Sequence, residues 1–220
     1  MVATACAARS RPIEPQRASS AWFSRSQQGR PVNRLARPHE DRTLGQPSWR
    51  TLRVHLRPGH RPHGGWLMAG SLRLAVALGR TGLVTLKREG DGATPRGRFR
   101  PVRLWWRADA VGRPSTRLPV RPTRRSDAWC EDPADRRYNR PIRLPDAATG
   151  DRLWRADKLY DLVVEIDHNT RPRVKGRGSA IFIHVARPGL GPTAGCVALP
   201  APALRRLLGR LSPKTRITIG

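Results

Sequence analysis

The sequence predicts a mainly β domain with one short helix, preceded by an N-terminal extension without regular structure. Three observations lead to this fold class. Short runs of alternating apolar and polar residues recur after residue 50, and only residues 201–211 space their apolar side chains as an amphipathic helix does. Residues 1–48 hold few aliphatic side chains and show no period. We therefore assign 1–48 to a disordered basic extension and 51–220 to the folded domain.

The β elements follow from alternation and from apolar runs. The predicted strands cover residues 52–56, 72–78, 83–86, 99–106, 159–166, 180–185 and 216–219. The run 180–185 is nearly all apolar, so we expect it at the centre of a sheet. Residues 107–157 are rich in Pro, Arg and Asp, and we expect a long irregular insertion there.

The helix is predicted at residues 201–211. Pro202 lies in its first turn, where a missing N–H costs little. Leucines at 204, 207, 208 and 211 form one apolar stripe along its length. We expect this stripe to pack on the sheet.

The chain is strongly basic, with 43 Lys and Arg residues against 16 Asp and Glu and a formal net charge of +27. One interpretation is an anionic partner, such as nucleic acid, anionic lipid or an acidic cell-wall polymer. The other is the codon bias of a GC-rich genome, because only four of the basic residues are lysines and the arginines are scattered. We favour the second, because no motif for a specific nucleic acid is present.

Cysteine and histidine spacing argues against a metal site. Cys6, Cys130 and Cys196 form no Cys-x-x-Cys pair, and no His or Cys has zinc-ligand spacing. The odd number argues against a disulfide framework, although a Cys130–Cys196 bridge is compatible with the sequence. We therefore expect no metal and no organic cofactor. We also expect no transmembrane segment, because no apolar run approaches the roughly 20 residues that a membrane-spanning helix requires. His168 is expected in a turn.

The segment 178–199 contains the chemistry. An apolar run ends at His184, a loop rich in Pro and Gly follows, and Gly195 precedes Cys196. A cysteine nucleophile requires at least a thiol and a neighbouring base such as an imidazole. The imidazole would raise the fraction of the cysteine that is present as thiolate. A helix beginning close behind Cys196 would lower the thiol pKa further, and the N–H groups of Gly195 and Cys196 would face an oxyanion. The alternative is a small buried cysteine and a satisfied core histidine.

Two motifs in order make this segment resemble a known family. The strand ending in His184, followed by Pro192-Thr-Ala-Gly-Cys-Val197, resembles the catalytic segment of the YkuD-type L,D-transpeptidases of peptidoglycan. Upstream, Thr94-Pro-Arg-Gly-Arg-Phe99 resembles the family's Thr-Pro-x-Gly-x-Phe turn. Trp129-Cys-Glu-Asp-Pro133, Tyr138-Asn-Arg140 and Leu159-Tyr-Asp-Leu162 resemble elements of a proteobacterial branch. The resemblance covers about 51–220 and implies a β-sandwich with one short helix after the catalytic Cys.

The resemblance also implies residue roles. Cys196 would be the nucleophile and His184 the general base and acid, oriented by the backbone carbonyl of Val185 or Ala186. Thr193 and Gly195 match the family's Ser/Thr and Gly before the Cys, and the Gly195 backbone would contribute to an oxyanion hole.

Some family positions differ here. Ala194 stands where the family commonly has His, and Ala198 and Leu199 stand where it has Arg or Asn. Those positions help to fix the oxyanion hole and to bind the donor's terminal carboxylate in the family. Arg187 is our candidate for the missing positive charge.

The implied reaction is cross-linking of peptidoglycan stem peptides through a Cys196 thioester. One alternative is a cysteine hydrolase, an L,D-carboxypeptidase or amidase, in which water resolves the thioester. A second is a non-enzymatic basic module that binds a polymer or nucleic acid. The family works in the cell envelope, whereas the sequence shows no recognisable export signal.

Overall fold

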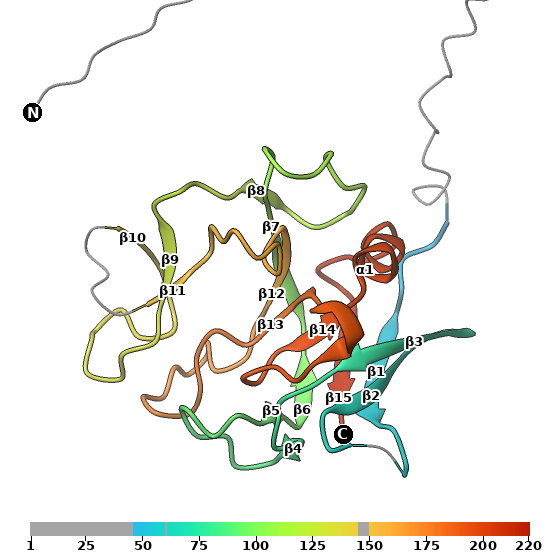
Figure 1. The fold of residues 1–220 in the computed structure, drawn as a ribbon, viewed down its shortest axis with the longest axis horizontal. Coiled ribbons are helices and arrows are strands. Elements are labelled where there is room, and N and C mark those ends of the chain that lie inside the picture. Colours follow the sequence, from blue (N-terminus) through green and yellow to red (C-terminus); the bar gives the residue numbers. More distant parts are fainter. Residues whose placement is uncertain (1–45, 60, 145–149) are drawn as a thin grey trace, which may run out of the picture. The chain divides into compact units, whose positions relative to one another are not determined.

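The computed structural model describes residues 46–59, 61–144 and 150–220, and this part of the chain is mainly β, as predicted (Figure 1). Its one α-helix is α1 (Ala201–Leu208). A short 3-10 turn, η1 (Pro188–Leu190), lies in the loop between His184 and Cys196. The predicted extension falls outside the described residues apart from positions 46–48.

Strands of the described residues form three sheets. Ten strands make the largest, in the order β6 (Gly97–Phe99), β15 (Arg216–Ile219), β1 (Thr51–Leu56), β2 (Gly64–Ala69), β3 (Leu72–Ala77), β14 (Val197–Leu199), β13 (Phe182–Val185), β12 (Leu162–Ile166), β7 (Pro101–Trp106) and β8 (Val120–Pro122). The second contains β10 (Pro141–Arg143), β9 (Asp127–Cys130) and β11 (Gly150–Arg152), and the third pairs β4 (Leu83–Val84) with β5 (Thr94–Pro95).

The main core lies inside the largest sheet. Leu52 of β1 and Leu104 of β7 belong to one buried cluster although several strands separate them in the sheet order. A single sheet can bring such strands to one core only by curling around it. β12 and β13 lie in the interior of the sheet order and are almost fully buried, which confirms a central position for the 180–185 run.

Helix α1 contributes the apolar stripe predicted for it. Leu204, Leu207 and Leu208 are buried and join the main core. The helix ends at Leu208, three residues before the predicted end, and its C-cap Gly209 keeps right-handed helical angles. Leu211 is nevertheless buried in the same core.

The predicted irregular insertion at 107–157 is only partly irregular. It contains β8 and the three-stranded sheet of β9, β10 and β11. These strands are three or four residues long and are interrupted by Pro and Asp, so no apolar period marks them. β9 is nonetheless buried at every position.

Two predicted strands begin later than expected. The 159–166 run is a strand only from Leu162, and the 180–185 run only from Phe182. Ala180 has φ +51°, outside the extended region, and its N–H is bonded to the Asn139 side chain at 3.2 Å. β2, with two glycines at its start, is a strand that the apolar pattern did not predict.

The described chain makes defined contacts from its first residues. Arg210 donates to the Pro47 carbonyl and to the Gln46 side chain, and its guanidinium lies 3.6 Å from the centroid of the Trp49 ring. Arg117 donates to Ser48 Oγ at 3.0 Å. Residues 46–48, assigned to the extension from the sequence, therefore contact the folded domain.

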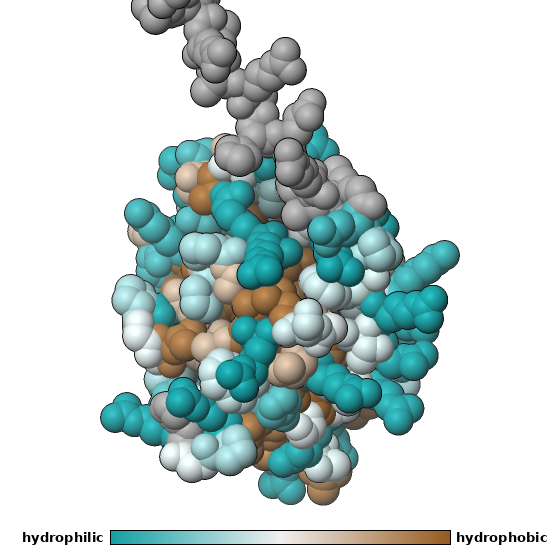
Figure 2. All heavy atoms as spheres, turned by 90° about the vertical axis from the view of Figure 1, so that its right-hand side faces the viewer, coloured by the Kyte–Doolittle hydropathy of each residue, from teal (hydrophilic) through white to brown (hydrophobic). Residues whose placement is uncertain are grey.

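Hydrophilic side chains project over much of the face turned toward the viewer in Figure 2, and apolar residues fill the gaps between them. This agrees with arginines scattered through the sequence rather than gathered in one block. Among the described residues, no helix combines the length and the hydropathy that crossing a membrane requires.

Candidate active site

β13 and β14 bring His184 and Cys196 to one side of the sheet. The two strands pair in parallel, with Ile183 opposite Val197 and His184 opposite Ala198. Cys196 directly precedes this register, so it lies beside Phe182 and shares a face with His184, because alternate residues of a strand face the same side. Cys196 is 7 % exposed and His184 6 %, and both line one cleft of about 440 Å³.

The Cys196 thiol is held by backbone groups. It donates to the Ala180 carbonyl at 3.2 Å and accepts from the Phe182 N–H at 3.3 Å. Burial raises the pKa of Cys196 to about 12, against the opposing effect of the Phe182 N–H. The sequence-based expectation of a raised thiolate fraction is therefore wrong for the resting protein, because desolvation outweighs the neighbouring groups.

Backbone groups of Val185 and Leu159 contact the His184 ring. Its Nδ1 lies 2.8 Å from the Val185 carbonyl oxygen, which can only accept, so Nδ1 carries the proton and Nε2 is left as the basic nitrogen. The ring packs edge-to-face on Tyr160, with centroids 5.1 Å apart. Burial lowers the pKa of His184 to about 4, so the resting imidazole is neutral at pH 7.

The turn before Cys196 is organised by Thr193. Its hydroxyl donates to the Cys196 carbonyl at 2.7 Å and accepts from the Gly195 N–H at 3.1 Å. Gly195 has φ +152°, and a Cβ there would come 2.8 Å from the Ala93 carbonyl oxygen. Glycine is required by this close approach. In this state the Gly195 N–H is engaged by Thr193 and does not face the cleft unpaired.

Helix α1 does not lower the pKa of the Cys196 thiol, as the sequence suggested it could. α1 begins only at Ala201, and β14 lies between it and Cys196. The positive end of a helix dipole falls off within about one turn. Strand pairing with β13 takes precedence over helix formation here because Val197–Leu199 are apolar and fully buried.

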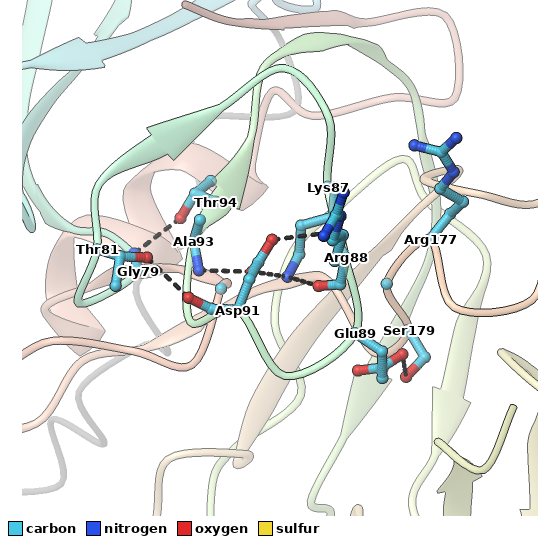
Figure 3. A network of polar contacts seen from close by, with 12 residues as sticks. Gly79, Thr81, Lys87, Arg88, Glu89, Asp91, Ala93, Thr94, Arg177 and Ser179 are labelled. Atoms are coloured by element: carbon cyan, nitrogen blue, oxygen red, sulfur yellow. Dashed lines mark hydrogen bonds and ion pairs between the residues drawn. The ribbon is translucent and has the colours of Figure 1, made fainter.

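The segment from Gly79 to Thr94 supports the turn before Cys196, and Figure 3 shows the contacts within this segment. The Thr94 hydroxyl accepts from the Gly79 N–H at 2.8 Å and donates weakly, at 3.4 Å, to the Cys196 carbonyl. Asp91 accepts from Ala93 N and pairs with the Lys87 ammonium. The segment is therefore braced internally and holds the Cys196 backbone through Thr94.

The cleft has charges of both signs on its walls. Three acidic side chains line it, Glu89, Glu131 and Asp151, and four basic ones, Arg80, Lys87, Arg155 and Arg187. Burial, with Asp151 and Glu89 adding to it, raises the pKa of Glu131 to about 7. The Asp151 carboxylate accepts from the Tyr160 hydroxyl at 2.5 Å and from Arg155 at 3.1 Å.

The insertion builds the floor of this region. Trp129 of β9 packs edge-to-face on Phe182 at a centroid distance of 5.0 Å and on Trp105 at 6.5 Å. Its indole N–H donates to Asn139 at 2.9 Å. Cys196 belongs to the same buried cluster as these rings. The small sheet thus fixes the apolar surroundings of the thiol.

The structure brings together the residues singled out from the sequence. His184, Arg187, Thr193, Gly195 and Cys196 all line the cleft, and the Val185 carbonyl contacts His184. His168 lies in a turn, with Nε2 3.1 Å from the Arg177 carbonyl, and does not line the cleft.

Sequence reasoning missed other parts of the site. Glu131 and Tyr160 lie in the segments 129–133 and 159–162 that resemble the family, but neither was assigned to the site, and no sequence signal pointed to Asp151. Within the described residues Cys130 and Cys196 are free, so the disulfide left open by the sequence does not form. No group of His, Cys, Asp and Glu there could hold a metal ion.

Comparison with known proteins gives one match. A family model described as the YkuD L,D-transpeptidase catalytic domain matches residues 63–219. The match includes β13, β14 and the whole cleft wall from Arg80 onward. No curated protein and no solved structure matches the chain.

Proposed function

Because the chain belongs to the YkuD family of L,D-transpeptidase catalytic domains, we propose that it is a cysteine acyltransferase that cross-links peptidoglycan stem peptides. The observation that carries the proposal is the thiol and the imidazole on one face of two paired strands, in one cleft. A buried thiol and a buried neutral base in a cleft have the composition of a nucleophile site rather than of a binding surface.

The first step forms a thioester. The Cys196 sulfur attacks the carbonyl between an L-centre and a D-residue of the donor stem, while His184 Nε2 takes the thiol proton. The same proton then passes to the departing amine of the D-amino acid as the C–N bond breaks. Thiol and imidazole are both neutral at rest, so proton transfer accompanies attack rather than preceding it.

The second step transfers the acyl group. The amine of a second stem attacks the thioester carbonyl, the C–S bond breaks, and the amine's proton returns to the sulfur through His184. The products are a new amide bond between two stems and the free thiol. No metal or organic cofactor enters this proposal.

Three groups support these steps. The Val185 carbonyl holds the His184 ring through Nδ1, which keeps Nε2 available. The Gly195 N–H contributes to the oxyanion hole once its 3.1 Å hydrogen bond to the Thr193 hydroxyl is broken. Arg187, exposed on the rim of the cleft, is a proposed contact for the substrate.

Hydrolysis is the second candidate outcome. Ala198 lines the cleft at a position where the family commonly carries a larger polar side chain, so water has space to reach the thioester. The products would be a trimmed stem and a free D-amino acid, as in an L,D-carboxypeptidase.

Mass spectrometry of muropeptides after incubation with the wild type and with Cys196→Ala tests the proposal. Cross-linked dimers formed only by the wild type support transfer, and trimmed monomers alone support hydrolysis. Unchanged muropeptides together with salt-sensitive polymer binding that survives Cys196→Ala would contradict both and favour a basic binding module.

A further inference from the structure

Lys87 is a buried lysine in the wall of the cleft that the proposed acyl transfer leaves without a role. It is 6 % exposed and lines the same cleft as Cys196 and His184. A charged ammonium is rarely buried to this extent unless it is paired or functional. We infer that Lys87 binds a carboxylate of the donor stem peptide beside Cys196, an inference that rests on the proposed function.

The Lys87 side chain lies in a preformed slot. Gly178 has φ +88°, and a Cβ there would come 2.8 Å from Lys87 Cγ and 3.1 Å from its Cε. The aliphatic stem therefore packs directly on the Gly178 backbone. A lysine fixed in this way loses little further rotamer freedom when a ligand binds, which favours recognition.

The Lys87 ammonium has donor capacity left. Its partners are the Arg88 carbonyl, at 2.9 Å, and the Asp91 carboxylate (Figure 3). An ammonium carries three N–H donors, so one is not used by the described residues. The Asp91 carboxylate in turn is shared with the N–H groups of Arg88 and Ala93, each at 2.8 Å. The aspartate thus orients Lys87 while it also closes the loop.

The other cations of the cleft are less suited to this role. Arg155 donates to Asp157 at 2.6 Å and to Asp151 at 3.1 Å, so its charge is compensated twice. Arg80 and Arg187 are exposed, where water screens a charge. Lys87 alone among the four combines burial with an unused donor, and its charge acts on the Cys196 thiol, whose pKa it lowers against the effect of burial.

The position fits a carboxylate close to the scissile bond. A stem peptide that ends one residue after the attacked carbonyl carries its terminal carboxylate near the nucleophile. Ala198 and Leu199 offer no charge for it, whereas Lys87 lies in the wall of the cleft and acts electrostatically on the sulfur. The neighbouring Glu89 does not compete for Lys87, because its carboxylate accepts from Tyr138 and, at 2.8 Å, from Ser179.

The test measures each protein variant with two donor peptides that differ only at the C-terminus. The donors are a stem tetrapeptide with a C-terminal carboxylate and the same peptide with a C-terminal carboxamide. The kcat/KM of thioester formation on Cys196 is followed by intact-protein mass for the wild type, Lys87→Met, Lys87→Gln and Arg187→Gln. Lys214→Met, an exposed lysine outside the cleft, is the matched control. Circular dichroism confirms that each variant is folded at the assay temperature.

We expect the wild type and Lys214→Met to prefer the carboxylate donor by about 10- to 100-fold, the range of a charge-assisted hydrogen bond. Both Lys87 variants should lose this preference. Removing the ammonium also removes its effect on the Cys196 thiol, which slows the reaction with both donors alike. The readout is therefore the ratio of the two rates, which should fall toward one.

Three outcomes overturn the inference. The preference persists in a folded Lys87 variant, it disappears in Arg187→Gln instead, or the wild type acylates but has no preference. The last outcome needs no variant at all and leaves the proposed function intact. Absence of any wild-type thioester with either donor, by contrast, contradicts the proposed function itself.

Discussion

At Cys196 and His184, burial decides the protonation states. The same desolvation that raises the thiol pKa to about 12 lowers the imidazole pKa to about 4. Each group is therefore neutral between these values, and the resting site holds no thiolate–imidazolium pair. A substrate that fills the cleft and brings its carbonyl to the sulfur would drive the proton transfer.

His184 should be required for acylation in a way that His168 is not. We expect His184→Ala to slow thioester formation by about 10²- to 10⁴-fold, the usual contribution of a general acid–base group, and to stay folded. His168→Ala should acylate nearly as fast as the wild type, because that side chain lies outside the cleft. Intact-protein mass with a stem-peptide donor measures both. Wild-type acylation by the His184 variant would remove it from the mechanism.

His184 should also make the fold less stable in acid. Its pKa is about 4 in the folded protein against an ordinary 6.5, because burial disfavours the charged ring. The stabilisation is fully present above pH 6.5 and is lost as the pH falls toward 4, since the unfolded chain binds the proton first. Two and a half pKa units correspond to about 3 kcal/mol. Urea unfolding at pH 7.5 and pH 4 should show this loss in the wild type and not in His184→Gln.

Alkylation of Cys196 in the native protein should be slow at pH 7. Burial raises the pKa of both Cys196 and Cys130, so the thiolate fraction is small at each. Iodoacetamide should label both more slowly in the folded than in the urea-unfolded chain, as read by peptide mass. Fast native labelling of Cys196 alone would mean that an ion pair exists at rest.

On the scale of elements, the turn before β14 depends on a glycine that the loop before β5 touches. We expect Gly195→Ala to lower the free energy of unfolding by about 1–3 kcal/mol and to slow acylation, because its Cβ would approach the Ala93 carbonyl at 2.8 Å with φ at +152°. Gly191→Ala is the matched control, since φ is −59° and nothing lies within 4 Å of a Cβ there. Its unfolding free energy should change by less than about 0.5 kcal/mol. Equal effects of the two substitutions would contradict this account.

Strands and helices whose apolar residues recur at a regular spacing could be predicted from the sequence. Elements without such a spacing could not. The 52–56 strand and the stripe of α1 repeat their apolar residues, and both lie where expected. β9 is buried on both sides, so alternation is absent, and its neighbours are too short to show any. Residue types and motif order singled out Cys196 and His184, and both line the cleft. Asp151 lies in no such motif and reaches the cleft only through tertiary folding.

For the whole molecule, the described contacts begin at Gln46 and depend on Trp49. The Trp49 ring lies under the Arg210 guanidinium. The Trp49 backbone N–H donates to the Arg210 carbonyl at 2.8 Å, and the Trp49 backbone carbonyl accepts from the Thr215 hydroxyl at 2.8 Å. Gln46, Pro47 and Ser48, which composition assigned to the extension, also contact Arg210 or Arg117 of the domain.

Two truncations test this boundary. A chain that begins at residue 46 should melt within about 2 °C of the full chain, because residues 1–45 offer little apolar surface. A chain that begins at residue 50 should melt several degrees lower, since it lacks the tryptophan and its partners. Thermal melting followed by circular dichroism measures both. Equal melting temperatures would mean that Trp49 contributes nothing to stability.

The direct pairing of β13 with β14 has a consequence for engineering. Cys196 and His184 are aligned by the pairing of the two strands, and the stretch from Arg187 to Pro192 joins these strands and contributes side chains to the wall of the cleft. That stretch is thus a replaceable module. Libraries that vary its length and sequence could retune which stems are accepted while the alignment of sulfur and imidazole stays the same, provided that Thr193 keeps its bridge to Gly79.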